Sequence, residues 1–343
     1  MLQIVFPAFA RTDELLDLMG AARLPNLDML HARARQESIP QASLEGMLCE
    51  RLGIAREHDW PIAAITLAGA GGQAGEDCWL RADPVHVRVE RDQLVLEEIH
   101  GAELHETELL RDALATHFGE AFSPQPLRPD AWVVRISGKL KIATTPPSLA
   151  AGRHIDPLLP AGPDALAWRK LLNEAQMLLF SHPVNQAREA RGDAPINSIW
   201  LWGGGRLPEA GARKPLLVLS SQPDLCALAR HAGAKADRLP QGCPVDLPED
   251  TVIILDAPHR HLRGGDFEAW LQAVQDFEQD WLAPLLASRR PFRLDDPLEG
   301  LRLNWRSAYR WKFWRRPQKP ARPSFTIRQP APDAGVDAFG NRY

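Results

Sequence analysis

The stretch from residue 173 to residue 205 constrains the fold more than any other part of the sequence. It reads NEAQMLLFSHPVNQAREARGDAPINSIWLWGGG. Apolar residues recur at helical spacing before Pro183, a second short helix fits residues 185–191, and Gly192 predicts a turn. Residues 196–202 are apolar enough for a strand that is covered on both faces. We therefore predict a helix, a turn and a buried strand, closed by three glycines.

Those glycines, Gly203, Gly204 and Gly205, follow the predicted strand directly. Because they lack Cβ atoms, a ligand or another backbone can come close to them. Open α/β sheets bind ligands beyond the carboxyl ends of their strands, which favours a ligand site here, and a tight turn without a ligand is the alternative. The phosphate-binding fingerprints GxGxxG and GxxxxGK[ST] are absent from this stretch. Nearby polar side chains need hydrogen-bond partners, either in the protein or on a ligand: Asn173, His182, Asn185, Arg188 and Asn197.

Strands and helices alternate through most of the remaining chain. This alternation predicts an α/β fold with a mainly parallel sheet flanked by helices. The predicted strands are 3–6, 215–219 and 251–255, and the predicted helices are 13–19, 26–35 with Asn26 as its N-cap, 44–52, 223–231 and 266–287.

Residues 57–165 follow a different pattern. They contain short apolar runs, beginning with 62–67, a hairpin turn at 90–93 and an amphipathic helix at 104–118. We interpret this segment as an inserted α+β subdomain. The core would then consist of residues 1–56 and 166–300, followed by a tail of residues 301–343.

The composition is that of an ordinary globular protein, with 45% apolar and 24% charged residues. No apolar run reaches the roughly 18 residues that span a bilayer, and the first residues lack the basic region of a secretory signal, so we expect a cytoplasmic protein. The four cysteines lie far apart without a CxxC pair. This spacing favours small buried side chains over a disulfide framework or a zinc ribbon.

The tail of residues 301–343 is strongly basic, although the whole chain has a net charge of −4. Residues 305–316 interleave aromatic and cationic side chains. Trp305 and Tyr309 share a helical face, so docking onto the parent domain is the simplest interpretation. A protein partner is the second, and nucleic acid or a membrane surface the least favoured.

Ser43 stands directly before the predicted helix 44–52, which Gly53 ends. A serine at this position is an ordinary N-cap. It would also be a suitable nucleophile, since the helix dipole and the free N–H groups favour an anionic phosphoryl group there.

Several segments together resemble the archaeal-type cofactor-independent phosphoglycerate mutases of the alkaline phosphatase superfamily. They are SLEGMLCERLG, DWPIAAITLAGAGG with the following ADPVHV, the opening stretch, PDLCALARHAGA, and DAPHRHLRGGDFEAWLQAVQDFE. The resemblance implies an alkaline-phosphatase-like core with an inserted subdomain. The chain resembles the bacterial RpfE-type regulatory proteins more closely, since NE.QM, HPVN and NSIWLWGGG recur in them, and this implies a regulatory function.

The mutases hold two metal ions with Asp and His, and a serine receives the phosphoryl group. Ser43 falls near that serine, but Phe6-Pro7-Ala8 replaces the Asp-Gly that follows the first strand, and the late Asp-His motif is not found. The weak metal candidates that remain are Asp256, His259, His261 and Asp266.

Two hypotheses follow from this comparison. In the first, the chain has lost the dinuclear centre, needs no cofactor and is a regulatory or binding protein for a phosphorylated metabolite. In the second, it is an active phosphotransferase or phosphohydrolase that uses Ser43 with Mn or Zn. Arg153, Arg188 and Arg206 are candidates for contacting an anionic ligand, because guanidinium groups match phosphate and carboxylate geometry.

Overall fold

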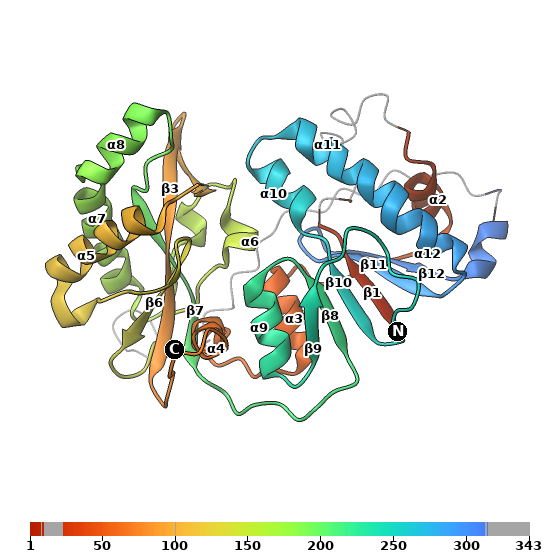
Figure 1. The fold of residues 1–343 in the computed structure, drawn as a ribbon, viewed down its shortest axis with the longest axis horizontal. Helices are drawn as coiled ribbons and strands as arrows, with labels where there is room; N and C mark the ends of the chain where they lie inside the picture. Colours follow the sequence, from red (N-terminus) through yellow and green to blue (C-terminus); the bar gives the residue numbers. More distant parts are fainter. Residues whose placement is uncertain (8, 10–22, 100, 313, 315–343) are drawn as a thin grey trace, which may run out of the picture.

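The structure is a computed structural model that describes residues 1–7, 9, 23–99, 101–312 and 314. Its described residues form two sheets, each with its own helices. In Figure 1 the seven-stranded sheet lies in the right half, and the five-stranded sheet with α5, α7 and α8 lies in the left half. The short helix α6 (Pro147–Ala150) lies between the two halves.

The seven-stranded sheet has the strand order β2-β12-β11-β1-β10-β8-β9. β1 pairs in parallel with β10 and β11, and β8 pairs in parallel with β10 and β9. Only β12 makes antiparallel pairs, with β11 and β2. The predicted α/β fold with a mainly parallel sheet is confirmed. The strands are β1 (Leu2–Val5), β2 (Arg35–Ser38), β8 (Leu217–Ser220), β9 (Lys235–Arg238), β10 (Thr251–Ile254), β11 (Phe292–Asp296) and β12 (Leu301–Trp305).

Helices cover both faces of this sheet because its central strands are apolar on both sides. Val252 and Ile254 of β10 pack on one face with α3 (Leu44–Leu52) and α9 (Pro223–His231). Ile253 between them packs on the opposite face. That face carries α2 (Pro25–Arg33), α11 (Phe267–Asp276), a π-helix (Phe277–Leu282) and α12 (Ala283–Ala287).

The second sheet is built around the long strand β3 (Cys78–Glu90). Along one edge β3 pairs with β4 and β6, and along the other with β7, in each case antiparallel. One face of this sheet packs against α5, α7 and α8. The remaining elements are β4 (Gln93–Glu98), β5 (Gln125–Arg128), β6 (Ala131–Ile136), β7 (Ser198–Arg206), α4 (Ile62–Gly69), α5 (Leu104–Phe118), α7 (Ala165–Phe180) and α8 (Pro183–Arg191).

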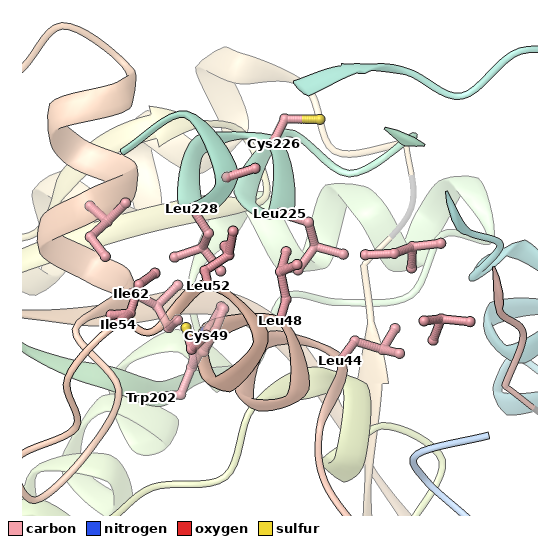
Figure 2. Close-up of a cluster of buried hydrophobic side chains, with 14 of the residues drawn as sticks. Leu44, Leu48, Cys49, Leu52, Ile54, Ile62, Trp202, Leu225, Cys226 and Leu228 are labelled. Atoms are coloured by element: carbon pink, nitrogen blue, oxygen red, sulfur yellow. The ribbon is translucent and has the colours of Figure 1, made fainter. Parts of the chain in front are cut away.

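The other face of the second sheet packs against the core helices. Trp202 of β7 belongs to the same apolar cluster as Leu48 of α3 and Leu225 of α9. Figure 2 shows the side chains of α3 and α9 meeting in this cluster, with Trp202 close to Cys49. One apolar cluster therefore spans the contact between the two sheets.

The position of β7 corrects the predicted domain boundary. We predicted a core strand at 196–202, but β7 pairs with β3 in the second sheet. The inserted unit therefore extends beyond residue 165 and includes α7, α8 and β7. An apolar run does not distinguish a parallel core strand from an antiparallel strand covered on both faces, and β7 has α7 on one side and α4 on the other.

The predicted start of the tail is also wrong, because β12 belongs to the core sheet. Leu303 and Trp305 point into the core between the basic residues Arg302 and Arg306, so the positive charge concealed a period-two strand pattern. Tyr309, in a short 3-10 helix (Ser307–Trp311), packs edge-on against Trp305. This part of the tail docks on the core; residues 313 and 315–343 lie outside the described residues.

Other local predictions have mixed outcomes. The helices at 44–52, 104–118 and 223–231 and the hairpin turn at 90–93 are confirmed. The apolar run 62–67 lies in the helix α4, the predicted cap Asn26 lies inside α2, whose N-cap is Leu24, and 266–287 divides into α11, the π-helix and α12. The predicted helix 13–19 lies outside the described residues. Within the described part of the chain, no helix has the length and apolar character needed to cross a membrane.

Candidate functional site

A cavity of about 360 Å³ lies where the second sheet meets the carboxyl ends of the core strands. The loop after β8 and helix α10 (Ala257–Arg263) supply its core side, and β3, β5, β7 and α6 supply the other. Four arginines line it together with serine, glutamine and carboxylate side chains. The polar lining residues are Glu45, Arg81, Asp83, Glu98, Arg128, Asp130, Ser148, Ser221, Gln222, Asp224, Arg260 and Arg263.

The cavity lies at the point where the chain changes direction across the core sheet. From β8 the chain passes through α9 on one face to the neighbouring strand β9. From β10 it passes through α10 and the helices of the opposite face to β11. The loops after β8 and β10 therefore separate at this edge, and such switch points are where open α/β sheets bind ligands.

A buried ion network joins the two sheets beside the cavity. Arg81 of β3 binds Asp83 through two hydrogen bonds of 2.9 Å and donates a third, also of 2.9 Å, to Asp224 in the first turn of α9. Arg128 at the end of β5 donates to both oxygens of Asp224, at 2.8 and 2.9 Å. Trp202 donates to Asp83 at 2.7 Å. These bonds fix the second sheet relative to α9.

The charges in this network determine its ionisation state. Burial alone would raise the pKa of Asp224, but the neighbouring Arg81 and Arg128 outweigh that effect and hold the pKa well below its usual range. Asp224 is therefore ionised across the physiological pH range, and it compensates the guanidinium groups of the buried Arg81 and the half-buried Arg128.

A second polar cluster lies where α3 and α10 meet α6. The Ser148 hydroxyl donates to Glu45 at 2.6 Å and accepts a hydrogen bond from Leu44 N at 3.3 Å. Arg263 forms a 3.0 Å ion pair with Glu98 and donates to the carbonyl of Pro147. The Nε of Arg263 is buried without a partner in the described part of the structure. A buried donor without a partner calls for an explanation, and beside a cavity a ligand is one.

Ser43 is the N-cap of α3, as one of the two interpretations predicts. Its hydroxyl accepts a 2.9 Å hydrogen bond from Gly46 N, and the residue is only 5% exposed. With Leu44 N bonded to Ser148, these amides at the start of α3 already have partners within the chain. Nucleophilic chemistry at Ser43 stays a prediction, since a phosphoryl group there would have to displace them.

Two of the four metal candidates, Asp256 and Asp266, are bonded to other groups of the chain. Asp256 accepts hydrogen bonds from Ser221 at 3.1 Å and Gln222 at 2.6 Å and forms a 3.0 Å ion pair with Arg260. Asp266 caps α11 by accepting from Ala269 N. In the described residues, no three His, Cys, Asp or Glu side chains are grouped to hold a metal ion.

His259 and His261 both lie on α10. Burial lowers the pKa of His259 well below its usual value, and Arg263 and Arg153 lower it further. Phe6, at the end of β1, stacks on Phe277 with ring centroids 4.0 Å apart, so no carboxylate extends that strand. This donor set does not fit the dinuclear centre that the resemblance implies.

The polar residues predicted in the opening stretch stabilise the second subdomain. Asn185 joins α8 to the start of β7 through Ile196, accepting at 2.7 Å and donating at 2.9 Å. Asn197 makes the corresponding pair of bonds with the backbone of Val87, at 2.7 and 2.9 Å. Arg188 is buried and donates to Glu106 at 2.6 Å.

The other predicted ligand contacts are dispersed over the same subdomain. His182 caps α8, Asn173 is exposed on α7, and Arg206 ends β7 as an exposed residue. Arg153 is half-buried in the loop after α6. None of the predicted ligand contacts lines the cavity described above, and ligand binding at them stays a prediction.

Gly203, Gly204 and Gly205 lie inside β7 rather than in a loop after it. A Cβ on Gly203 would come within 2.8 Å of Ile62 Cβ, and one on Gly205 within 2.9 Å of Pro61 Cβ. The close neighbour of these two glycines is therefore the start of α4, whereas a Cβ on Gly204 would meet Leu140 and Leu80. The missing Cβ atoms allow either a ligand or another part of the chain to come close, and the structure shows the second.

The arginines that line the cavity were not predicted from the sequence. Arg81 and Asp83 are opposite charges two residues apart in an apolar run, so they share one face of a strand, and this signal was available. Asp224 was likewise visible in the sequence, since it lies at the start of a predicted helix. Neither pattern reveals that the two elements meet, because their partnership spans 143 residues of sequence.

Curated relatives match less than half of the chain. It is 29% identical over 163 residues to the 2,3-bisphosphoglycerate-independent phosphoglycerate mutase of Methanosarcina mazei. The aligned residues make up 41% of each protein. It is 28% identical over 177 residues to the probable enzyme of the same name from Geobacter sulfurreducens, covering 46% of this chain and 44% of the relative. No family model matches the sequence.

Two solved structures also align with the chain. The cofactor-independent phosphoglycerate mutase from Thermoplasma acidophilum is 19% identical, with 89% of each chain covered and a TM-score of 0.38. The PH0037 protein from Pyrococcus horikoshii is 15% identical, with 85% of this chain and 80% of that chain covered and a TM-score of 0.43. Scores this low have no bearing on function. By sequence, the chain is similar to 2,3-bisphosphoglycerate-independent phosphoglycerate mutases, and it spans less than half the length of these curated relatives.

Proposed function

We propose that this protein is a phosphoglycerate-mutase-like binding protein with a regulatory role, and that it takes a small phosphorylated metabolite into the cavity between its two sheets without a metal centre. The observation that carries the proposal is the position of the cavity. It lies at the switch point between β8 and β10, and Arg81, Arg128, Arg260 and Arg263 line it.

The two arginines of α10 are the donors we assign to the ligand. Arg260 lines the cavity and its side chain is 44% exposed, so it can turn from Asp256 toward an anion. Arg263 already has a donor without a partner. Guanidinium groups bind phosphate oxygens with two parallel hydrogen bonds, which suits a phosphate ester.

Arg81 and Arg128 have a different role in this proposal. Both are bound to Asp224 and hold the second sheet against α9. They fix the width of the cavity and the orientation of the second sheet beside it, so that a ligand binds to a preformed site.

The chemistry of the donor set supports binding rather than phosphoryl transfer. Asp256 accepts hydrogen bonds from Ser221 and Gln222, Asp266 caps a helix, and the strand end that would supply a carboxylate carries Phe6. Phosphoryl transfer with two metal ions needs several carboxylate ligands to hold the ions and to balance the charge of the transferred group.

Metal analysis and a turnover assay on the purified protein separate this proposal from an active phosphotransferase. We expect less than one equivalent of Mn or Zn after dialysis against either ion. We also expect equal background turnover of 3-phosphoglycerate and a generic phosphate ester in the wild type and in Ser43→Ala. Stoichiometric metal, with turnover that disappears in Ser43→Ala, would establish the enzyme instead.

A further inference from the structure

Glu45 occupies an unusual position for an acidic side chain. It is the second residue of α3, it is 4% exposed, and it lines the same cavity as Arg263. Its carboxyl group accepts the 2.6 Å hydrogen bond from Ser148. An acidic side chain of the protein therefore lies at the place where the start of α3 faces the cavity.

The start of a helix attracts anions, because its N–H groups and the helix dipole favour negative charge. α3 is nine residues long, and its first amides are bonded to Ser148 and Ser43. A buried arginine lines the same cavity as Glu45. The side chain of Arg263 is only 10% exposed, and its Nε has no partner in the described structure.

The charges around the cavity do not favour an additional anion. Five carboxyl groups and four guanidinium groups line it. The carboxylates of Asp83 and Asp224 are held in the ion network, and Glu98 is paired with Arg263. Glu45 has no arginine within hydrogen-bond distance in the described structure. If Glu45 is neutral, the lining holds four carboxyl groups and four guanidinium groups, so their charges balance.

We infer that Glu45 acts as an internal competitor for the anionic group of the ligand, so that a tetrahedral oxyanion binds beside α3 and Arg263 only when Glu45 carries a proton. This inference rests on the proposed function of the cavity. It makes Glu45 the residue that determines how much negative charge the site accepts, and it couples binding to proton uptake.

The neighbours of Glu45 support this coupling. Burial raises the pKa of Glu45; the hydrogen bond from Ser148 and the charge of Arg263 oppose the increase, and Asp224 adds to it. A bound anion a few ångströms away would raise the pKa of Glu45 further, since like charges disfavour each other. The bound state then holds more protons than the free state. Affinity must therefore increase as the pH falls through the pKa values of Glu45, and level off below them.

Titration with inorganic sulfate tests this inference, because sulfate stays a dianion throughout the range from pH 5 to pH 8. In the wild type we expect the affinity to increase as the pH falls, by at most about tenfold per pH unit for one linked proton. Glu45→Gln should bind sulfate at pH 7.5 at least about tenfold more tightly than the wild type, with a flat pH profile. Calorimetry in buffers of different ionisation enthalpy should show proton uptake only in the wild type.

Glu268→Gln is the matched control. Like Glu45, Glu268 is the second residue of its helix, which is α11. Unlike Glu45, it is exposed and lies outside the cavity lining. This variant should retain the wild-type affinity and pH profile. Thermal unfolding of each variant checks that the fold is intact.

The possible failures are distinguishable. If Glu45→Gln binds within twofold of the wild type and keeps its pH dependence, the role of Glu45 is contradicted, whereas the cavity still binds anions. If neither the wild type at pH 5 nor Glu45→Gln binds sulfate or 3-phosphoglycerate, the role of Glu45 and the proposed function of the cavity both fail.

Discussion

Arg81 and Asp224 form a buried ion pair of 2.9 Å that joins strand β3 of the second sheet to helix α9 of the core. The two residues are 143 positions apart in the sequence, and their side chains are 1% and 11% exposed. The width of the cavity beside them therefore depends on a contact between two units of the fold.

Replacing Asp224 with asparagine should be strongly destabilising. The variant leaves the buried Arg81 and the half-buried Arg128 with less negative charge beside them, and breaking a buried ion pair costs about 3–5 kcal/mol. Urea unfolding of Asp224→Asn should show this loss. Asp112→Asn is the control, because Asp112 is exposed at its pair with Arg111, and its loss should change the free energy of unfolding by less than about 1 kcal/mol. Equal effects of the two substitutions would contradict the role of the network.

Gly203→Ala should destabilise the junction between β7 and α4. Gly203 has a positive φ of 66°, and a Cβ there would come within 2.8 Å of Ile62 Cβ. Gly71 provides a control with a positive φ of 86° and nothing within 4 Å of the added Cβ. We expect a loss of about 1 kcal/mol for Gly71→Ala, from backbone strain alone, and at least about 3 kcal/mol for Gly203→Ala, from strain and overpacking together. Similar losses in thermal unfolding would show that the contact with Ile62 is unimportant.

Asp59 should make the stability of the protein depend on pH. Burial raises its pKa to about 6, although Thr144 and two backbone N–H groups donate to it. Since this pKa is above the unfolded value of 3.8, the favourable contribution is complete below pH 3.8 and is lost as the pH rises through 6. The full difference, from well below pH 3.8 to well above pH 6, corresponds to about 3 kcal/mol. In Asp59→Asn this part of the pH dependence of the unfolding free energy should disappear, and an unchanged profile would contradict the assignment.

Much of the fold could be predicted from local patterns. Helices α3, α5 and α9 follow from caps, stop signals and apolar spacing, all of which lie within about fifteen residues of sequence. The sheet to which β7 belongs could not be predicted in this way. Its apolar run fits either sheet, and pairing with β3 is a contact across more than a hundred residues.

The candidate site was less predictable than the fold. Ser43 was correctly predicted as a helix cap because that signal is local. Asn185 and Arg188 have polar side chains that would suit a binding site. In the structure Asn185 bonds to the backbone of Ile196, and Arg188 donates to Glu106. Arg263 was missed, since its importance depends on α6 covering the start of α3 and on one donor without a partner.

The central claim is that the cavity binds a phosphate ester without a metal ion, through the arginines of α10. Titration of 3-phosphoglycerate into the chelator-treated protein, followed by calorimetry, tests it most directly. The account predicts saturable 1:1 binding that weakens at least tenfold in Arg260→Met and in Arg263→Met. Arg135→Met, at an exposed arginine outside the cavity lining, should bind within twofold of the wild type. Binding that requires Mn²⁺, or that survives both substitutions on α10, would contradict the account.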